Sequence, residues 1–328
     1  MKMLITGASG FTGAHLIRHF ARQGHEIIAL GWQKAAPTQL LKYASYLSAD
    51  IRQEIPTQQV DVVIHTAALT SDQAPFEELY QTNVEGTRHV FEACREASLF
   101  IYLSSSSVYP FSEQPLTESD VDLARTTSAY GRSKYLAEQY LLEQSDQSPL
   151  LILRPRAIYG SQDRVLLPRI LRMVRSGRII SPGRMDIEVS MTHIDNLIRA
   201  IERGMLSDID SPCILNIADE QTYQLREVIQ SLVEGIHQRP LPIRSLSPHL
   251  LLGLSKLLAI FGRASQLSQQ AIDYLTQPLV LNVAKAQQTI GYRAVTSFEE
   301  ERSKIVDWVH DIGLETVLKK PQKLSWKL

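Results

Sequence analysis

The chain has 328 residues, of which 44% are hydrophobic and 21% charged, a composition typical of a globular protein with a large core and room for about two domains. Its formal charge of -1, without a basic cluster interleaved with aromatic residues, argues against a nucleic-acid partner. Met1 is followed directly by a strand pattern, which leaves no room for a secretory signal, and Cys94 and Cys213 are typical of reduced thiols, so we expect a cytoplasmic protein.

The first motif is the stretch LITGASGFTG, in which an apolar strand breaks into three glycines, Gly7, Gly10 and Gly13. The residues that follow, 11–23, have the apolar spacing of a helix. A strand, a glycine turn and a helix start expose backbone N–H groups and the positive end of a helix dipole at one point, which suits a phosphate. By itself this pattern leaves an ordinary tight turn open as the alternative.

Strand and helix then alternate along the first half of the chain. Near-continuous apolar runs predict buried strands, and longer periodic segments between them predict helices. Such alternation is typical of an α/β Rossmann fold, a doubly wound parallel sheet with right-handed crossovers. The predicted strands cover 26–30, 62–65, 99–103 and 150–153, and the predicted helices cover 76–97 and 128–144.

Beyond residue 160 the alternation is lost and prolines become frequent. Helices are predicted over 165–176 and 225–234. We expect a dinucleotide-binding domain over 1–160, with returning segments near 189–218, and a smaller, mainly helical substrate-binding cap over 161–328. The apolar segment Pro248 to Gly262 is too short to span a membrane, for which about 20 residues are needed. It is predicted to be a buried helix, with a lid over a lipophilic substrate or an interfacial helix as alternatives.

The stretch SAYGRSK predicts acid/base chemistry. Tyr130 and Lys134 are four residues apart and therefore share one face of a helix. A neighbouring ammonium lowers the pKa of a phenol, which can then exchange a proton with a substrate oxygen. A run of serines that includes Ser105 follows the preceding strand, at the end of the sheet where ligands bind. A surface Tyr–Lys pair and a plain serine turn are the alternatives.

Two other groups of residues have a simpler interpretation. His15 and His19 have the spacing of a helical metal pair, but no further ligand accompanies them, so no metal site is predicted. Several arginines lie between Arg164 and Arg184. They could clamp a substrate diphosphate, but the polar side of a helix is the favoured interpretation.

Seven short motifs, in order, resemble the signature of the extended short-chain dehydrogenase/reductases, the NAD-dependent epimerase/dehydratase group. The resemblance implies that Ser105 is the catalytic serine and Tyr130 the acid/base. It also implies that Lys134 lowers the pKa of Tyr130 and binds the nicotinamide ribose. The motifs are TGASGFTG, ADI, VIHTAA, TNVEGT, LSSSSVY, YGRSK and LRPRAIYG.

The same resemblance implies a set of cofactor contacts beside the three glycines. Phe11 and Thr12 would lie over the pyrophosphate, and Asp50 and Ile51 would meet the adenine. The remaining contacts implied are Thr66, Ala67 and Ala68 after the third strand, Asn83 from the next helix, and Pro155, Ala157 and Ile158 near the nicotinamide.

The end of the second predicted strand departs from the pattern of NAD-preferring proteins. They carry an acidic residue there, which binds the adenosine ribose, whereas this chain has Gly31. Without that carboxylate a 2′-phosphate is not repelled, and Lys34 could pair with it. We therefore favour NADP over NAD as the cofactor.

The predicted reaction is the interconversion of a secondary alcohol and a ketone. Ser106 and Ser107 stand where dehydratases of the family carry an Asp-Glu pair, which disfavours dehydration. The second half is similar to the 3-beta-hydroxysteroid and sterol dehydrogenase branch, which implies an apolar, sterol-like or keto-acid substrate. The alternatives are a nucleotide-sugar 4-epimerase or reductase, and a non-catalytic dinucleotide-sensing regulator. Family resemblance also implies a homodimer, formed through helices 76–97 and 128–144.

Overall fold

The computed structural model describes residues 1–71, 73–126, 128–146, 148–249, 251–253, 268–319 and 326. Most of the predicted apolar segment Pro248 to Gly262 therefore lies outside the described residues. Among the helices that are described, none is both long and apolar enough to cross a membrane.

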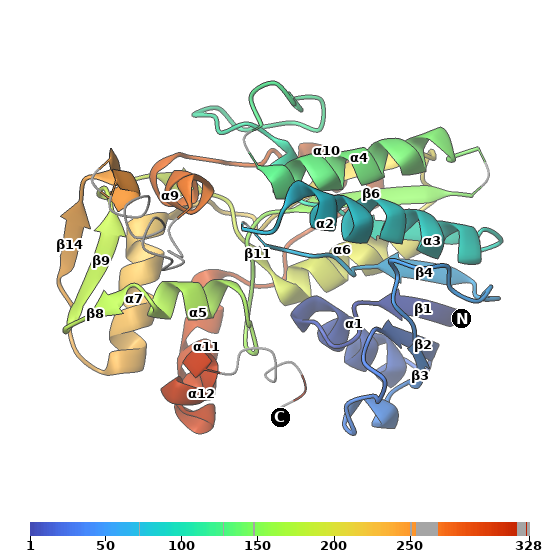
Figure 1. Cartoon of the computed structure of the whole chain (residues 1–328), viewed down its shortest axis with the longest axis horizontal. Coiled ribbons are helices and arrows are strands. Elements are labelled where there is room, and N and C mark those ends of the chain that lie inside the picture. Colours follow the sequence, from blue (N-terminus) through green and yellow to red (C-terminus); the bar gives the residue numbers. More distant parts are fainter. Residues whose placement is uncertain are drawn as a thin grey trace.

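Seven parallel strands form the central sheet, in the order β12-β6-β5-β4-β1-β2-β3 (Figure 1). Ile5 of β1 pairs with Ala29 of β2 on one side and with Ile64 of β4 on the other. The strand order reverses between β1 and β4. Sheets of this kind bind ligands at such a reversal, in the crevice beyond the carboxyl ends of the strands. The predicted doubly wound sheet is confirmed. Its strands are β1 (Lys2–Thr6), β2 (Glu26–Gly31), β3 (Ser45–Ser48), β4 (Val62–His65), β5 (Leu99–Leu103), β6 (Leu150–Pro155) and β12 (Cys213–Ile217).

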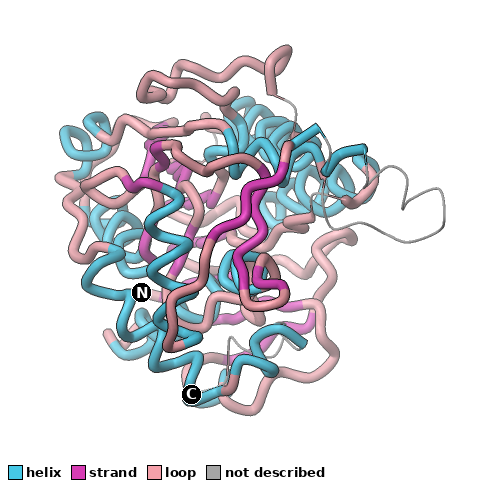
Figure 2. The backbone as a smooth tube through the Cα atoms, turned by 90° about the vertical axis from the view of Figure 1, so that its left-hand side faces the viewer, coloured by secondary structure: helices cyan, strands magenta, loops and turns pink. Residues whose placement is uncertain are grey.

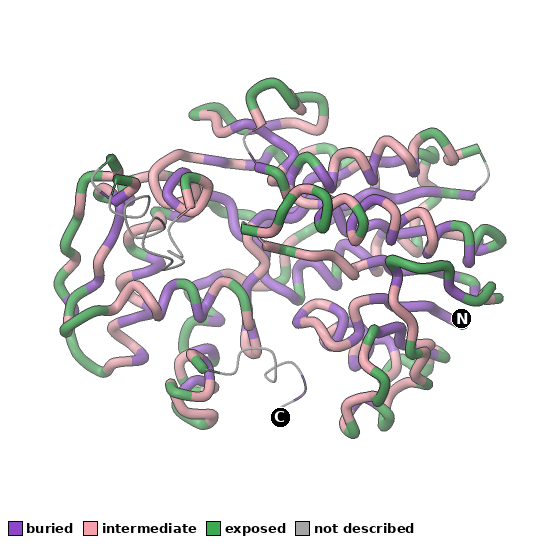
Figure 3. The backbone as a smooth tube through the Cα atoms, in the orientation of Figure 1, coloured by how far each residue is buried: buried purple, intermediate pink, exposed green. Residues whose placement is uncertain are grey.

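Helices cover both faces of this sheet, because successive residues of a strand point to opposite sides. Met3 and Ile5 pack into one core with α1, α6 and α10, whereas Leu4 packs into a second core with α3 and α4. Burial on both faces explains why the strands read as continuous apolar runs, and Figure 3 shows them as largely buried segments. The helices of these two layers are α1 (Phe11–Arg22), α2 (Phe76–Tyr80), α3 (Gly86–Ala93), α4 (Ala129–Glu143), α6 (Ile194–Leu206) and α10 (Ala284–Ile290).

The C-terminal region is helical but also contains a three-stranded sheet, β14-β9-β8, which faces the viewer in Figure 2. Two short strand pairs, β7 with β11 and β10 with β13, join it to the rest of the chain. Its elements are β7 (Ile158–Tyr159), α5 (Leu166–Leu171), β8 (Val174–Arg175), β9 (Arg178–Pro182), β10 (Glu188–Val189), β11 (Thr192–His193), β13 (Tyr223–Gln224), α7 (Leu225–His237), β14 (Ile243–Leu246), α9 (Gln269–Thr276), α11 (Phe298–Ile312) and α12 (Leu314–Lys319).

Two predicted helices differ from the structure. The helix predicted over 165–176 is wrong after Leu171, because β8 and β9 form a hairpin whose two turn residues, Ser176 and Gly177, have φ of 48° and 72°. Positive φ at both turn residues is the signature of a tight hairpin. The helix predicted over 76–97 is interrupted by the π-helical turn η2 (Gln81–Glu85) and ends at Ala93. The remaining short turns are η1 (Leu40–Lys42) and η3 (Ser106–Val108).

A buried ion pair fixes α4 over the carboxyl end of β6. Arg154 of β6 contacts Glu138 of α4 twice, with Nη2 2.5 Å from Oε2 and Nε 3.0 Å from Oε1. Arg154 Nη1 also donates to the hydroxyl of Tyr109 at 2.8 Å and to the carbonyl oxygen of Glu118 at 2.9 Å. A charge buried this deeply requires such a complete set of partners. The pair thus sets the position of the helix that carries Tyr130 and Lys134.

Candidate active site

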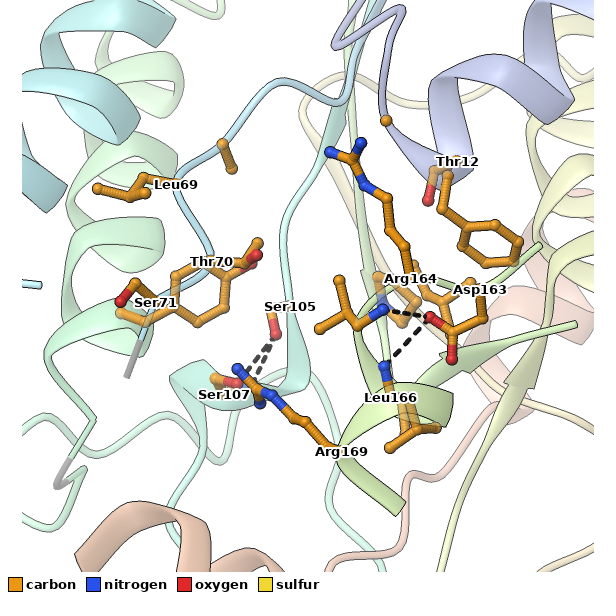
Figure 4. A pocket seen from close by; sticks show the side chains of 18 of the residues that line it. Thr12, Leu69, Thr70, Ser71, Ser105, Ser107, Asp163, Arg164, Leu166 and Arg169 are labelled. Atoms are coloured by element: carbon orange, nitrogen blue, oxygen red, sulfur yellow. Dashed lines mark hydrogen bonds between the residues drawn. The ribbon is translucent and has the colours of Figure 1, made fainter. Parts of the chain in front are cut away.

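A cavity of about 1980 Å³ lies between the carboxyl ends of the central strands and the C-terminal region (Figure 4). Single small-molecule pockets measure roughly 300–1,000 Å³. This cavity therefore has room for a dinucleotide and a second ligand together.

The glycine turn after β1 forms one end of the cavity. Gly10 N donates to Gly7 O at 2.7 Å, and a Cβ on residue 13 would lie only 2.4 Å from that same carbonyl oxygen. Helix α1 begins after Gly10, and no side chain caps its first N–H groups. The close approach and the uncapped helix start form a cradle that fits a diphosphate.

Thr6 ties the two strands on either side of the crevice. Its Oγ1 accepts hydrogen bonds from the backbone N–H of Thr66 at 3.1 Å and of Ala67 at 3.0 Å. The hydroxyl of Thr66 donates in return to the carbonyl oxygen of Thr6 at 2.7 Å. These bonds hold the chain after β4 against the glycine turn, so that both line the same cavity.

The end of the cavity where the adenosine is predicted to bind is lined by Gly31, Trp32, Asp50 and Arg52. The Asp50 carboxylate accepts from the backbone and guanidinium of Arg52, with Nη2 2.6 Å from Oδ2, and these bonds hold the pKa of Asp50 below its usual value. Lys34 is exposed and does not line the cavity. The cation at this end is therefore Arg52, which sequence reasoning missed.

Asn83 is buried and also lies outside the cavity lining. Its Oδ1 accepts from Leu69 N at 2.7 Å, and its Nδ2 donates to Leu69 O at 3.1 Å and to Ser133 Oγ at 2.9 Å. Asn83 thus connects the loop after β4 to helix α4 through these hydrogen bonds.

Helix α4 starts in direct contact with the serine loop. A Cβ on residue 131 would lie 1.9 Å from the carbonyl oxygen of Ser107, so only glycine fits at this approach. Ser128 caps the helix by accepting from Gly131 N at 2.9 Å. Ser105 caps η3, and its Oγ accepts from Ser107 N at 3.1 Å. Ser105 and Tyr130, the residue before Gly131, both line the cavity.

Lys134 lies one turn further along α4 and is almost completely buried, with 1% of its surface exposed. Its Nζ lies 4.1 Å from the centre of the Tyr102 ring. At this distance the electrons of the ring face stabilise the ammonium through a cation–π interaction. Burial lowers the pKa of Lys134 to about 7. The negative charge of the Glu138 carboxylate opposes this decrease. Burial, together with the nearby Lys134, also lowers the pKa of His65 to about 3, so His65 is neutral.

Most of the predicted site residues come together in this one cavity, while their individual roles stay predictions. Lys34 and Asn83 are the exceptions. His15 and His19 have separate partners, the carbonyl oxygen of Ser161 and the carboxylate of Glu202. The predicted residues that line the cavity are Gly7, Gly10, Phe11, Thr12, Gly13, Asp50, Ile51, Thr66, Ala67, Ala68, Ser105, Tyr130, Lys134, Pro155, Ala157 and Ile158.

Three further residues enter the cavity from the second half of the chain. Arg164 Nη1 donates to the carbonyl oxygen of Ser9 in the glycine turn at 2.9 Å. Figure 4 shows Arg164 and Arg169 pointing into the cavity. Tyr274 of α9 places its hydroxyl 2.8 Å from Ser107 Oγ. No sequence signal links positions so far apart.

Comparison with known proteins matches residues 3–218 to the family described as "NAD dependent epimerase/dehydratase family". The 2-alkyl-3-oxoalkanoate reductase of Stenotrophomonas maltophilia (strain K279a) is 31% identical over 211 residues, covering 60% of this chain and 62% of that protein. The 3-beta-hydroxysteroid dehydrogenase of Mycolicibacterium neoaurum is 24% identical over 339 residues, covering 95% of this chain and 92% of that protein. The structure of UDP-glucuronic acid 4-epimerase from Bacillus cereus in complex with NAD superimposes with a TM-score of 0.74 at 20% identity, covering 95% of this chain and 99% of that one.

The buried Lys134 predicts a pH-dependent stability. Its pKa is about 7 in the folded protein and 10.5 ordinarily, so between these values the unfolded chain binds a proton that the folded chain does not. The free energy of unfolding then rises with pH through this window. Lys134→Met should be more stable than the wild type at pH 6, on the order of 4 kcal/mol, and about half of that gap should be lost by pH 9.

Urea unfolding at pH 6 and pH 9 without dinucleotide measures this gap. The control is Lys42→Met, at an exposed lysine. A gap for Lys134→Met that is the same at both pH values would contradict the prediction.

Proposed function

Because the chain belongs to the NAD-dependent epimerase/dehydratase family, we propose that it interconverts a secondary alcohol and a ketone on an apolar substrate. It is an enzyme of the extended short-chain dehydrogenase/reductase type. The observation that carries the proposal is that Ser105, Tyr130 and Lys134 line one cavity with the glycine turn.

The chain's own residues supply the proton and hold the substrate oxygen. In the direction of reduction, Tyr130 donates its hydroxyl proton to the carbonyl oxygen, and Ser105 Oγ donates a hydrogen bond to the same oxygen. The Lys134 ammonium stabilises the phenolate that results. A bound nicotinamide dinucleotide supplies or accepts the hydride. The N–H groups at the start of α1 would hold its pyrophosphate, and Lys134 its nicotinamide ribose.

The walls contributed by the C-terminal region support an apolar substrate. Leu166, Ile170, Met191, Val228 and Ile229 all line the cavity there. The two named relatives, an oxoalkanoate reductase and a hydroxysteroid dehydrogenase, act on substrates of this kind. We therefore place ketone reduction or alcohol oxidation ahead of nucleotide-sugar epimerisation.

Tyr130→Phe tests the proposed reaction. The phenylalanine keeps the ring but has no proton to donate, so turnover of an aliphatic or steroid ketone should fall about 10²- to 10⁴-fold. Dinucleotide affinity should change little. The matched control is Tyr140→Phe, on the same helix, whose hydroxyl donates to Glu92 on the protein surface at 2.9 Å.

Interconversion of UDP-sugars by the wild type without net cofactor turnover would instead favour the epimerase. If Tyr130→Phe leaves function in the cell unchanged, a non-catalytic dinucleotide-sensing role is supported.

We further propose that NADP is preferred over NAD. In support, Gly31 ends β2 without a carboxylate, and the Arg52 guanidinium lies at the adenosine end of the cavity. A charge-assisted contact from Arg52 to a 2′-phosphate predicts a higher kcat/KM with NADPH than with NADH. Arg52→Gln should reduce this preference roughly tenfold and leave the NADH value unchanged.

The control for Arg52→Gln is Arg88→Gln, because Arg88 pairs with Glu85 away from the cavity. A wild type that turns over faster with NADH, or a preference unaffected by Arg52→Gln, would count against this part of the proposal.

A further inference from the structure

Arg156 brings a positive charge into the cavity with no charged partner among the residues that the structure describes. Its side chain lines the cavity although only 8% of the residue is exposed. Its Nε has no hydrogen-bond partner, and none of the described carboxylates forms an ion pair with it. The guanidinium instead packs against an aromatic ring, with its carbon 5.1 Å from the centre of the Tyr274 ring.

Arg154, two residues earlier, shows what a fully partnered buried arginine looks like in this protein. Its guanidinium is bound by Glu138, by the Tyr109 hydroxyl and by a backbone carbonyl. Arg156 is about as deeply buried and has none of these bonds. Burying a cation is unfavourable unless an anion or a set of acceptors compensates it. In the cavity, that compensation has to come from a ligand.

The position of Arg156 relates this charge to the reacting atoms. Tyr274, whose ring lies against the guanidinium, places its hydroxyl 2.8 Å from Ser107 Oγ. Ser107 Oγ in turn accepts from Ser105 Oγ at 3.1 Å. Only two side chains therefore separate the guanidinium from the catalytic serine. An anion bound by Arg156 therefore lies in the same cavity as the predicted catalytic serine.

The surrounding walls limit the rest of that substrate. Ile180, Met191 and Leu275 line the same cavity as Arg156 and Tyr274 and offer no polar side-chain group. A guanidinium binds a carboxylate through two parallel hydrogen bonds, a geometry that needs a planar anion. A carboxylate followed by an aliphatic chain would pair with the Arg156 guanidinium and pack against the apolar side chains of the cavity.

We propose that Arg156 binds the carboxylate of the substrate, and that the enzyme acts on 3-oxo and 3-hydroxy acids with an aliphatic chain. This assignment rests on the proposed alcohol–ketone chemistry and names its substrate class. One carbon separates the carboxylate from the reacting carbon in such acids, so both groups fit in the cavity that Arg156 and Ser105 share. In the oxidation, the hydride on C3 goes to the oxidised nicotinamide and the hydroxyl proton goes to the Tyr130 phenolate. Tyr274 is a positioning residue.

Binding without turnover tests Arg156 directly. Calorimetry with decanoate and with 1-decanol, which has the same chain without the charge, compares the wild type with Arg156→Gln. Decanoate affinity should fall about 30-fold or more in the variant, whereas decanol affinity should change less than about threefold. Arg156→Lys should restore part of the decanoate affinity. Arg226→Gln is the control, because Arg226 forms an exposed ion pair with Asp186 outside the cavity.

Equal loss for decanoate and decanol, or no loss, would overturn the assignment. So would a loss of UDP affinity in Arg156→Gln without a loss for decanoate, because the bound anion would then be a phosphate.

Turnover separates this assignment from the proposed function. Wild type should oxidise 3-hydroxydecanoate with a kcat/KM at least about tenfold above that of its methyl ester, and Arg156→Gln should remove this difference through KM. Tyr274→Phe should keep the preference for the acid, because the ring under the guanidinium remains. Oxidation of acid and ester at equal rates would overturn the assignment and leave the proposed function intact. If decanoate binding depends on Arg156 but neither compound is oxidised, the proposed function fails and the carboxylate site stands.

Discussion

The contact between the start of helix α4 and the serine loop is the constraint on which the site depends. The loop carbonyl of Ser107 comes so close to Gly131 that any side chain at that position would overlap it. Tyr130 precedes this glycine and Lys134 follows it by less than one turn, so the contact sets the position of both relative to the serine loop. The Arg154–Glu138 pair further along α4 holds the same helix to the sheet. Helix, loop and sheet are thereby held together beside the proposed catalytic residues.

The charges of the cavity follow a common pattern. Lys134 and Arg156 are buried, line the cavity and lack a carboxylate in direct contact among the described residues, whereas Arg154, nearby but engaged with Glu138, is fully paired. Arg164 and Arg169 also line the cavity from the C-terminal region, so its walls there combine positive charge with apolar side chains. Such an environment favours a phenolate, and it favours ligands that bring negative charge with them.

Much of this arrangement could be predicted from the sequence, because local patterns determine it. Glycine spacing after β1, the i, i+4 pair Tyr130 and Lys134, and continuous apolar strands all act over a few residues. Features that depend on tertiary contacts could not be predicted. Arg52, in the loop after the edge strand β3, lines the cavity whereas Lys34 does not, and no local pattern indicates this.

The second half of the chain was harder to predict for the same reason. The segment after Leu171 has helical apolar spacing, but two turn residues with positive φ direct it into a hairpin. Arg156 belongs to the motif LRPRAIYG, which is recognisable in the sequence. That its buried guanidinium has no carboxylate partner among the described residues follows only from the structure. Tyr274 reaches Ser107 across 167 positions of sequence.

The turnover of Gly131→Ala tests the central claim most directly. If the contact of α4 with Ser107 sets the catalytic geometry, the added methyl group shifts Tyr130 away from Ser105, and kcat should fall about 100-fold while dinucleotide affinity at the separate glycine turn is kept. Gly235→Ala, where the methyl group would meet the side chain of Val306 far from the cavity, controls for a helical glycine substitution. A folded Gly131→Ala enzyme with wild-type kcat would contradict the account.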